Sequence, residues 1–436
     1  MTDQRKVAAA GAALAIILAA ALFLLLGNQR ADSRSQVISS PTAGAQPQAT
    51  LTSTAIPGTP TATPASSASD PRYEITYVNQ GALWLTQLGV DTPPRKLLDG
   101  ECVDIRWSPS GDRLVCRLPG TPDRATFMLR IVDGTGKSVV DIADASGFVW
   151  SPSGSHLAYL ADPSLQNAFR MFIVDKNGQA VTDLPTAYKA FGPVGIVWSP
   201  ESAAVAYGHP LGISSYHLAT GRQMALLNDA SSFPLAWVRQ GQAVLIATEQ
   251  RECERACYKA AVLDIGTGRT TPVPALDNSI DHWVSPDASL AVFVSNQVEN
   301  GRIAGIGLGI LDFSNQVITP ITGSSISYPS DHIPTQHVVW TPDSSHVYWF
   351  HSGASWGEGG VYRARRDGQE FTQIKDWGPE PVFGAIRFSP DVRKALILRP
   401  VSQTGTWRLL DLQTNAETQA SLPSGFQGWR PLGPQN

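Results

Sequence analysis

The stretch that decides the fold is Trp107-Ser-Pro-Ser-Gly-Asp-Arg-Leu-Val-Cys-Arg-Leu118. It holds an aromatic residue, a turn and an apolar strand, in that order. Pro presets the backbone angle for the first central position of a turn, and Gly completes the turn. The residues from Leu114 onward alternate like a half-buried β-strand. The same pattern returns along the rest of the chain, so this stretch is one copy of a repeat.

Seven further copies follow the first, the one at Trp237 lacking the Pro and the last one truncated. The distance between copies runs from 39 residues (Trp198 to Trp237) to 56 residues (Val284 to Trp340), which is the length of a four-stranded propeller blade with variable loops. The copies after Trp107 begin at Trp150, Trp198, Trp237, Val284, Trp340, Phe388 and Trp429.

A second signal recurs in step with the first. Each repeat later carries a short turn of residues that tolerate the positive φ of tight hairpins. Each repeat therefore predicts four strands, the first ending at the Trp-Ser-Pro turn and the last two joined by the hairpin. The hairpin turns are Gly134-Thr-Gly136, Asn177-Gly178, Thr220-Gly221, Gly266-Thr-Gly268, Ser314-Asn315, Asp367-Gly368 and Thr414-Asn415.

This pattern resembles the TolB-type, WD-like β-propeller repeat over about residues 71 to 431. The resemblance implies the propeller fold and no particular function. TolB itself resembles this chain only in the propeller. The α/β domain that precedes the propeller in TolB has no counterpart here, so its partners cannot be carried over.

We expect an all-β propeller of eight four-stranded blades, with seven as the alternative if one degenerate repeat is not a blade. Three strands are predicted before the first repeat, without an aromatic repeat residue of their own: residues 73–78, 83–88 and 95–98. One strand that ends in such a residue is predicted after the last full repeat, at residues 425–430, with no further strands behind it. Together they make one blade that closes the ring. Closure removes the free sheet edges that invite aggregation.

The N-terminal part predicts a membrane anchor and a linker. Residues 7–27 carry no charge and, as a helix, would span about 31 Å, enough for a hydrocarbon core. We interpret them as an uncleaved signal anchor, with a cleaved signal peptide or a buried helix as alternatives. Residues 1–6 would be cytoplasmic, residues 28–70 a disordered Ser/Thr/Pro/Ala-rich linker, and residues 432–436 a tail after the propeller of residues 71–431.

Composition excludes some classes and explains most of the tryptophans. The 33 basic and 37 acidic residues give a net charge of −4, with no basic excess for nucleic-acid binding. Of the 12 Trp, six stand at the repeat position, where packing between blades explains them better than ligand stacking. The predicted structural anchors are Trp107, Trp150, Trp198, Trp237, Trp340, Phe388 and Trp429.

The long loops predict where a binding site would lie. The junctions between second and third strands and the crossings between blades fall on one face, and they hold every long segment. Long loops on a rigid scaffold often carry binding, although loop length also drifts where nothing constrains it. The candidate binding residues on this face are Trp356, Trp377, Arg251, Arg255, Glu299 and His332.

No motif predicts catalysis or a cofactor. Residues 353–357 match G-x-S-x-G, but they lie between strands and no His follows His351. Asp331, His332 and His337 make only a weak metal pattern. We therefore expect no catalytic residue, no metal and no cofactor.

The four cysteines suggest two disulfides without proving them. Cys253 and Cys257 lie in a charged loop with no further metal ligands nearby, so a disulfide is the better interpretation. Cys102 and Cys116 flank the first Trp-Ser-Pro turn and are either bridged or two small core residues.

The sequence thus predicts a single-pass membrane protein whose propeller lies outside the cytoplasm and acts as a non-catalytic protein-interaction scaffold. The expected partners are the membrane, through residues 7–27, and another envelope protein. One alternative is a glycan-binding protein or hydrolase with a site built from the long loops. Another is a sensor module beside a membrane signalling protein.

Overall fold

The chain divides into two compact units, Met1–Ser67 and Ala68–Asn436. The computed structural model describes residues of the second unit only, and it is described here by itself. The described residues are 73–88, 92–119, 127–161, 170–184, 195–250, 257–277, 282–299, 302–321, 338–352, 359–377, 386–401, 404–420, 422 and 426–431. The predicted anchor and linker, residues 7–27 and 28–70, lie outside them. Within the described part, no helix is long and apolar enough to cross a membrane.

Most of the described strands form four-stranded antiparallel sheets whose strands follow chain order. These sheets consist of β11 (Ile196–Trp198), β12 (Ala204–His209), β13 (Gly212–His217) and β14 (Arg222–Leu227); β15 (Ser232–Val238), β16 (Ala243–Gln250), β17 (Cys257–Asp264) and β18 (Thr270–Pro272); β19 (His282–Val284), β20 (Leu290–Glu299), β21 (Arg302–Asp312) and β22 (Ile318–Pro320); β23 (Val338–Trp340), β24 (His346–Ser352), β25 (Gly359–Arg365) and β26 (Thr372–Asp376); and β27 (Ile386–Phe388), β28 (Lys394–Val401), β29 (Thr404–Asp411) and β30 (Glu417–Gln419). A short 3-10 turn, η1 (Pro274–Leu276), follows β18.

One sheet has seven strands because a single strand serves two repeats. The strand β7 pairs with β6 on one side and with β8 on the other, and its register shifts between Ala145 and Gly147. It is the last strand of one repeat and the first of the next. The strands are β4 (Asp104–Trp107), β5 (Arg113–Leu118), β6 (Phe127–Asp133), β7 (Ser138–Trp150), β8 (His156–Ala161), β9 (Arg170–Asp175) and β10 (Ala180–Leu184).

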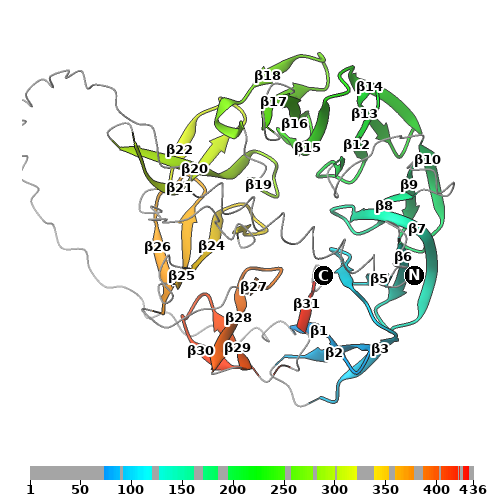
Figure 1. Cartoon of the computed structure of the whole chain (residues 1–436), viewed down its shortest axis with the longest axis vertical. Coiled ribbons are helices and arrows are strands. Elements are labelled where there is room, and N and C mark those ends of the chain that lie inside the picture. The colour runs from blue at the N-terminus through cyan, green and yellow to red at the C-terminus, as the bar shows by residue number, and fades with distance from the viewer. Residues whose placement is uncertain are drawn as a thin grey trace, which may run out of the picture. The chain divides into compact units, whose positions relative to one another are not determined.

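Strands from both ends of the unit share the remaining sheet. The strand β31 pairs antiparallel with β1, placing Trp429 opposite Ile75. The sheets stand around a ring with the first strand of each repeat nearest the centre, so β31 closes the ring beside β1 (Figure 1). This closure is the one that the sequence predicted. The sheet consists of β31 (Phe426–Arg430), β1 (Glu74–Asn79), β2 (Ala82–Gln87) and β3 (Arg95–Asp99).

The Trp-Ser-Pro turn repeats because its serine stabilises the backbone on both sides. The amide of Ser108 donates to the carbonyl of Arg113 (2.8 Å), and the amide of Arg113 donates to the Ser108 hydroxyl (3.1 Å). The fourth residue of the turn, Gly111, has φ +71°, which suits glycine. A buried serine thus satisfies a backbone amide that would otherwise be costly to bury. The equivalent residues Ser151, Ser199, Ser285, Thr341 and Ser389 make the same backbone bond.

The repeated tryptophans connect neighbouring sheets, as predicted. In five of the six, the indole N–H donates to the carbonyl of the residue that precedes the anchor of the previous repeat, and all six rings are buried. The bonds are Trp150 to Arg106 (3.2 Å), Trp198 to Val149 (3.2 Å), Trp237 to Val197 (2.8 Å), Trp340 to Trp283 (2.8 Å) and Trp429 to Arg387 (2.9 Å). Phe388 cannot make this bond, and its ring packs against Tyr348 at 6.4 Å between centroids.

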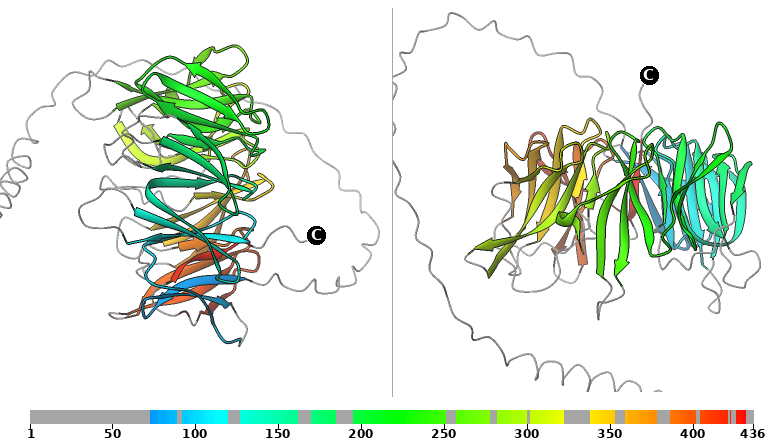
Figure 2. Two further views of the ribbon diagram at one scale, coloured as in Figure 1. Left: turned by 90° about the vertical axis from the view of Figure 1, so that its right-hand side faces the viewer. Right: turned by 90° about the horizontal axis from the view of Figure 1, so that it is seen from above.

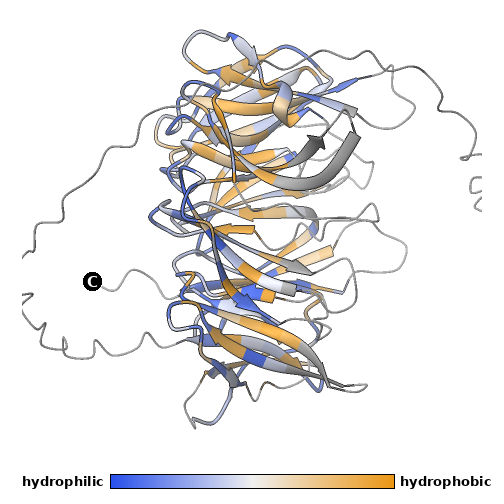
Figure 3. Ribbon diagram, turned by 90° about the vertical axis from the view of Figure 1, so that its left-hand side faces the viewer, coloured by the Kyte–Doolittle hydropathy of each residue, from blue (hydrophilic) through white to orange (hydrophobic). Residues whose placement is uncertain are grey.

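The core lies between the sheets. Each cluster of buried side chains joins two neighbouring repeats; for example, Ile213 and Ala206 pack with Trp237 and Ile246. Apolar residues accordingly concentrate in the strands, while polar residues gather in the turns (Figure 3). The ring is therefore held by a chain of similar interfaces, each of which removes apolar surface from water.

Candidate functional site

The two faces of the ring carry different connections. The Trp-Ser-Pro turns and the hairpins between third and fourth strands lie on one face, and the junctions between second and third strands lie on the other (Figure 2). Two second-to-third junctions are tight, at Gln80–Gly81 and at Pro210–Leu211. The strands β20 and β21 form the longest hairpin and extend beyond their neighbours on this second face.

Few of the predicted binding residues lie among the residues that the structure describes. Trp356, Arg251, Arg255 and His332 lie outside the described residues, as do the G-x-S-x-G segment and the Asp331–His337 segment. Glu299 is the last residue of β20, and its backbone pairs with Arg302. The long-loop surface therefore stays a prediction for these positions.

Trp377 corrects the expectation of an exposed aromatic side chain. It is only 5% exposed, and its ring packs against Phe350 at 6.2 Å between centroids. Its indole N–H donates to a carboxylate oxygen of Glu417 (3.2 Å) on the following sheet. The residue leaves its sheet just after β26 and turns into the interface between two repeats, where burying an indole with a hydrogen-bond partner is favourable.

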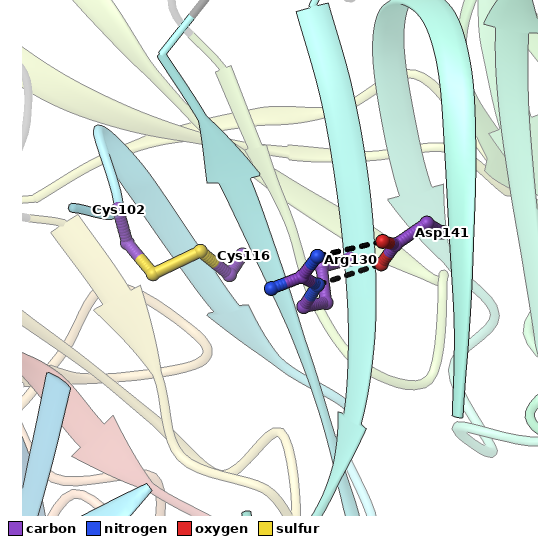
Figure 4. The surroundings of a disulfide bond; sticks show 4 residues. All are labelled: Cys102, Cys116, Arg130 and Asp141. Carbon is purple, nitrogen blue, oxygen red and sulfur yellow. Dashed lines mark hydrogen bonds and ion pairs between the residues drawn. A yellow bond between two sulfur atoms is a disulfide. The ribbon is translucent and has the colours of Figure 1, made fainter. Parts of the chain in front are cut away.

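A disulfide joins Cys102 to Cys116 across the start of one repeat (Figure 4). The two Cα atoms are 5.5 Å apart, within the range that a disulfide spans. Both residues are buried, and Val103 N–H donates to Arg117 O (2.8 Å) beside the bridge. Closing a loop of this length stabilises a fold by about 3 kcal/mol. The side chains of Cys253 and Cys257 lie outside the described residues.

A bidentate ion pair lies next to this disulfide. Arg130 is the strand neighbour of Cys116, and its guanidinium donates to both carboxylate oxygens of Asp141 at 2.6 Å (Figure 4). The hydrogen bond from Arg130 lowers the pKa of Asp141, and the same bond raises the pKa of Arg130. Both side chains are partly exposed, so the pair contributes modestly to stability. It is a structural contact between β6 and β7.

A Ser–His contact on β12 and β13 is the described pair that most resembles catalytic machinery. The Nε2 atom of His209 lies 2.8 Å from the hydroxyl of Ser214, while the amide of Leu211 donates to Nδ1 of the same ring (3.3 Å). Since Nδ1 accepts, the proton of a neutral ring sits on Nε2 and is donated to the serine. A general base would have to accept there instead.

The surroundings of this pair agree with a structural role. Ser214 is 2% exposed, so a substrate cannot reach its hydroxyl in this conformation. Burial lowers the pKa of His209, which keeps the ring neutral. Burial also raises the pKa of the adjacent Tyr207 to about 12, and Gln223 donates to that hydroxyl (2.6 Å). The group is a polar network between strands that is buried at Ser214 and Tyr207 and exposed at Gln223.

Carboxylates in the turns also have structural roles, as acceptors of hydrogen bonds. Burial alone would raise the pKa of Asp112, but hydrogen bonds from Lys176 and Ser110 outweigh it and lower the pKa to about 2. Hydrogen bonds from Thr341 and Ser345 lower the pKa of Asp343 to about 2. Catalytic acids need a pKa raised toward neutrality. No carboxylate with a resolved shift in the described part moves that way.

Two junctions are reinforced by ion pairs that the sequence did not reveal. Lys176 Nζ lies 2.6 Å from Asp112 Oδ2 of the previous repeat, and Arg366 lies 3.2 Å from Asp287 of its previous repeat. Both cations follow the third strand of their repeat. An alignment of the repeats at the residue after the third strand would have shown these basic residues, because other repeats have an apolar residue there, such as Leu218 or Phe313. In the described ranges, no group of three or more His, Cys, Asp or Glu could hold a metal ion.

The geometry defines a β-propeller, and solved structures agree at the level of the fold. A structure described as the eukaryotic initiation factor aligns with a TM-score of 0.52 and 12% identity, covering 84% of this chain and all of the other. Dipeptidyl peptidase 4 from Porphyromonas gingivalis aligns with a TM-score of 0.53 and 12% identity, over 80% of this chain. This chain spans 57% of the length of that peptidase.

The likeness to TolB stays at the level of a propeller-type repeat. TolB from Acinetobacter baumannii aligns with a TM-score of 0.35 and 13% identity over 73% of this chain and 82% of its own, too little to support a shared function. No protein-family model matches the chain, and no curated protein matches it either.

Proposed function

We propose that this protein is a membrane-anchored, extracytoplasmic propeller of eight blades that serves as a non-catalytic scaffold for another envelope protein. The number of innermost strands, with β7 supplying one of them, supports eight blades. The anchor is residues 7–27, and the linker of residues 28–70 holds the propeller away from the membrane.

The observation that carries the scaffold proposal is the use of the polar side chains. The Ser–His pair has its proton on the wrong nitrogen for nucleophilic catalysis, and the turn carboxylates are held ionised by hydrogen bonds. A rigid ring with structural carboxylates in the turns of one face and loops of uneven length on the other suits protein binding.

The disulfide supports the proposed location. Structural disulfides persist in oxidising compartments and are rare in the cytosol. The bridge between Cys102 and Cys116 is buried, so a role in packing suits it better than one in exposed redox chemistry.

Cross-linking in native membranes tests the proposal. The full chain, carrying an affinity tag, is cross-linked in intact cells, and co-purified proteins are identified by mass spectrometry. The scaffold proposal expects reproducible enrichment of a particular envelope protein over a control in which residues 1–70 are fused to an unrelated domain. Recovery of no partner, together with hydrolysis in a broad glycoside and peptide screen, would favour the enzyme alternative instead.

A further inference from the structure

The tryptophan hydrogen bonds align one residue of each innermost strand at a common level. Five of the residues that directly precede an anchor accept an indole N–H through their carbonyl oxygen. We call this layer the inner rim. It consists of Arg106, Val149, Val197, Ala236, Trp283, Val339, Arg387 and Gly428.

The side chains of the inner rim lie on the opposite side of their strand from the anchors, and apolar ones such as Val149 and Val197 pack in part against the core of the neighbouring interface. Successive residues of a strand point to opposite sides, so a buried anchor is preceded by a residue directed the other way. None of the eight rim residues is buried, whereas the tryptophan anchors beside them are. The guanidinium of Arg106 reaches toward the following strand, where it lies 5.6 Å from the ring centre of Phe148.

The charge of the rim is positive and confined to one sector. Its charged members are Arg387 on β27 and Arg106 on β4, and between these strands lies β31, which contributes Gly428. The side chain of Arg106 is 56% exposed, and its acidic contact in the described part is Asp104 at 3.7 Å. The Arg387 guanidinium donates to the carbonyl of its neighbour Ile386 (3.0 Å) and has no carboxylate within ion-pair distance among the described residues.

The position between the two arginines is open. A Cβ atom added to Gly428 would meet no atom within 4 Å. On the rest of the rim the residues are apolar, among them Trp283 and Val339. The rim therefore combines two exposed cations, on the strands to either side of β31, with an apolar remainder, in a chain whose net charge is −4.

We propose that this sector of the inner rim binds an acidic segment of a partner protein, with Arg106 and Arg387 each binding a carboxylate of that segment. A guanidinium binds a carboxylate through two parallel hydrogen bonds, which makes arginine well suited to such sites. Because β31 separates the two strands, two carboxylates of one extended chain fit the arrangement better than a single small anion. The site lies where the innermost strands enter the Trp-Ser-Pro turns, so it is separate from the long-loop face.

A binding assay with a defined acidic peptide tests this site. The full chain in neutral detergent is titrated into fluorescein-labelled hexaglutamate, and fluorescence anisotropy reports binding. We expect Arg106→Gln and Arg387→Gln each to weaken binding about tenfold, since a lost charge-assisted hydrogen bond has roughly that effect. Added salt should weaken binding by the wild type. Gly428→Leu should weaken it by filling the free space at the rim position of β31 without changing the charge.

The matched control is Arg222→Gln, which removes an exposed arginine from the outer strand β14 and should leave binding unchanged. Equal binding by the wild type and the double variant R106Q/R387Q would overturn the proposal. So would hexaglutamine binding as tightly as hexaglutamate. Binding of free glutamate as tight as that of the peptide would replace the acidic segment by a small anion and also overturn it.

The proposal builds on the scaffold function, and the two can fail separately. If the double variant and the wild type recover the same cross-linked partner in equal amounts, the rim is not its docking site and the scaffold stands. If the wild type recovers no partner, the scaffold falls, and the peptide titration still decides whether the rim binds acidic chains.

Discussion

Two junctions between neighbouring blades share the same sequence repeat but are stabilised by different contacts. Between β4 and β7 the indole of Trp150 donates to Arg106 O, and Lys176 pairs with Asp112. Between β31 and β4 the corresponding indole, that of Trp107, is buried with no hydrogen-bond partner in the described part. Its equivalent acceptor, the carbonyl of Gly428, receives the hydroxyl of Thr76 instead (3.1 Å).

An arginine replaces the missing bond at the closing junction. Arg430 donates to Gly111 O (2.7 Å) and to Glu74 (2.6 Å), and its guanidinium lies 4.8 Å from the ring centre of Trp107. It occupies the place that serine has in the other repeats, as in Trp107-Ser108. The serine is needed to hold the strand that follows the turn, and no such strand follows here within the described residues. The position is therefore free to join the two ends of the propeller.

The largest effect is expected from Gly111→Ala at the closing junction. The new Cβ would lie too close to the backbone oxygen of Pro431, and Gly111 has φ +71°. Because neither backbone can move without disturbing the closure, we expect a loss of about 3 kcal/mol or more. Urea unfolding of the full chain, followed by Trp fluorescence, measures it. Gly428→Ala, with open space around its Cβ, is the control and should change little; equal stability of the two variants would contradict the account.

A smaller difference is expected between the two cations. Arg430→Ala removes an ion pair, a hydrogen bond and a stacking contact from a side chain that is 20% exposed, so we expect a loss of about 2 kcal/mol. Lys176→Ala removes an ion pair whose cation is 42% exposed and should cost below about 1 kcal/mol. The same unfolding experiment compares them. A larger loss for Lys176→Ala would mean that the closing junction has no special dependence on its arginine.

The tryptophans themselves give the sharpest matched comparison. Trp150→Phe loses an indole hydrogen bond and leaves Arg106 O without that donor, so we expect a net loss of about 1 kcal/mol beyond the effect of ring size. Trp107→Phe loses no such bond and should show only the effect of ring size and of a weaker contact with Arg430. The difference between their urea midpoints is the measurement. If Trp107→Phe proved the more destabilising of the two, its indole would have a partner that the structure lacks.

The smallest expected effect is the pH dependence of the stability that Asp112 contributes at the junction between β4 and β7. The pKa of Asp112 is lowered from 3.8 to about 2, so its stabilising contribution is present above pH 4 and is lost as pH falls from about 4 to 2. Asp112→Asn should therefore cost below about 1 kcal/mol at pH 7, since the carboxylate is partly exposed, and less at pH 2, where about half of the carboxyl groups are protonated. Unfolding curves at the two pH values measure this, and a cost of the substitution that is equal at pH 2 and pH 7 would contradict it.

A comparison of Asp112 with Asp343 distinguishes the effect of an ion pair from that of hydrogen bonds at the same pH. Its pKa is also lowered to about 2, but by hydrogen bonds from Thr341 and Ser345 within its own turn. Adding salt at pH 7 should therefore reduce the cost of Asp112→Asn and leave that of Asp343→Asn unchanged.

The sequence predicted the parts of the fold that repeat. Anchors such as Trp198 and turns such as Ser151–Gly154 recur at fixed positions, and turn geometry leaves few residue types able to fill them. Trp377 was predicted incorrectly because its burial depends on Glu417 and its neighbours in another repeat, which local spacing does not show. The role of Arg430 was missed although its place in a serine position marks it. The rim arginines became visible only when the indole bonds aligned the strands.

Hydrogen exchange of the closing strand tests the central claim most directly. We predict that amides of β31 (Phe426–Arg430) in the full chain are as protected as those of the innermost strands β11 and β27, because β31 completes a sheet with β1. Mass spectrometry of exchanged peptides gives the comparison. Exchange of β31 at the rate of an unstructured peptide, while β11 and β27 stay protected, would show that the ring is not closed in this way.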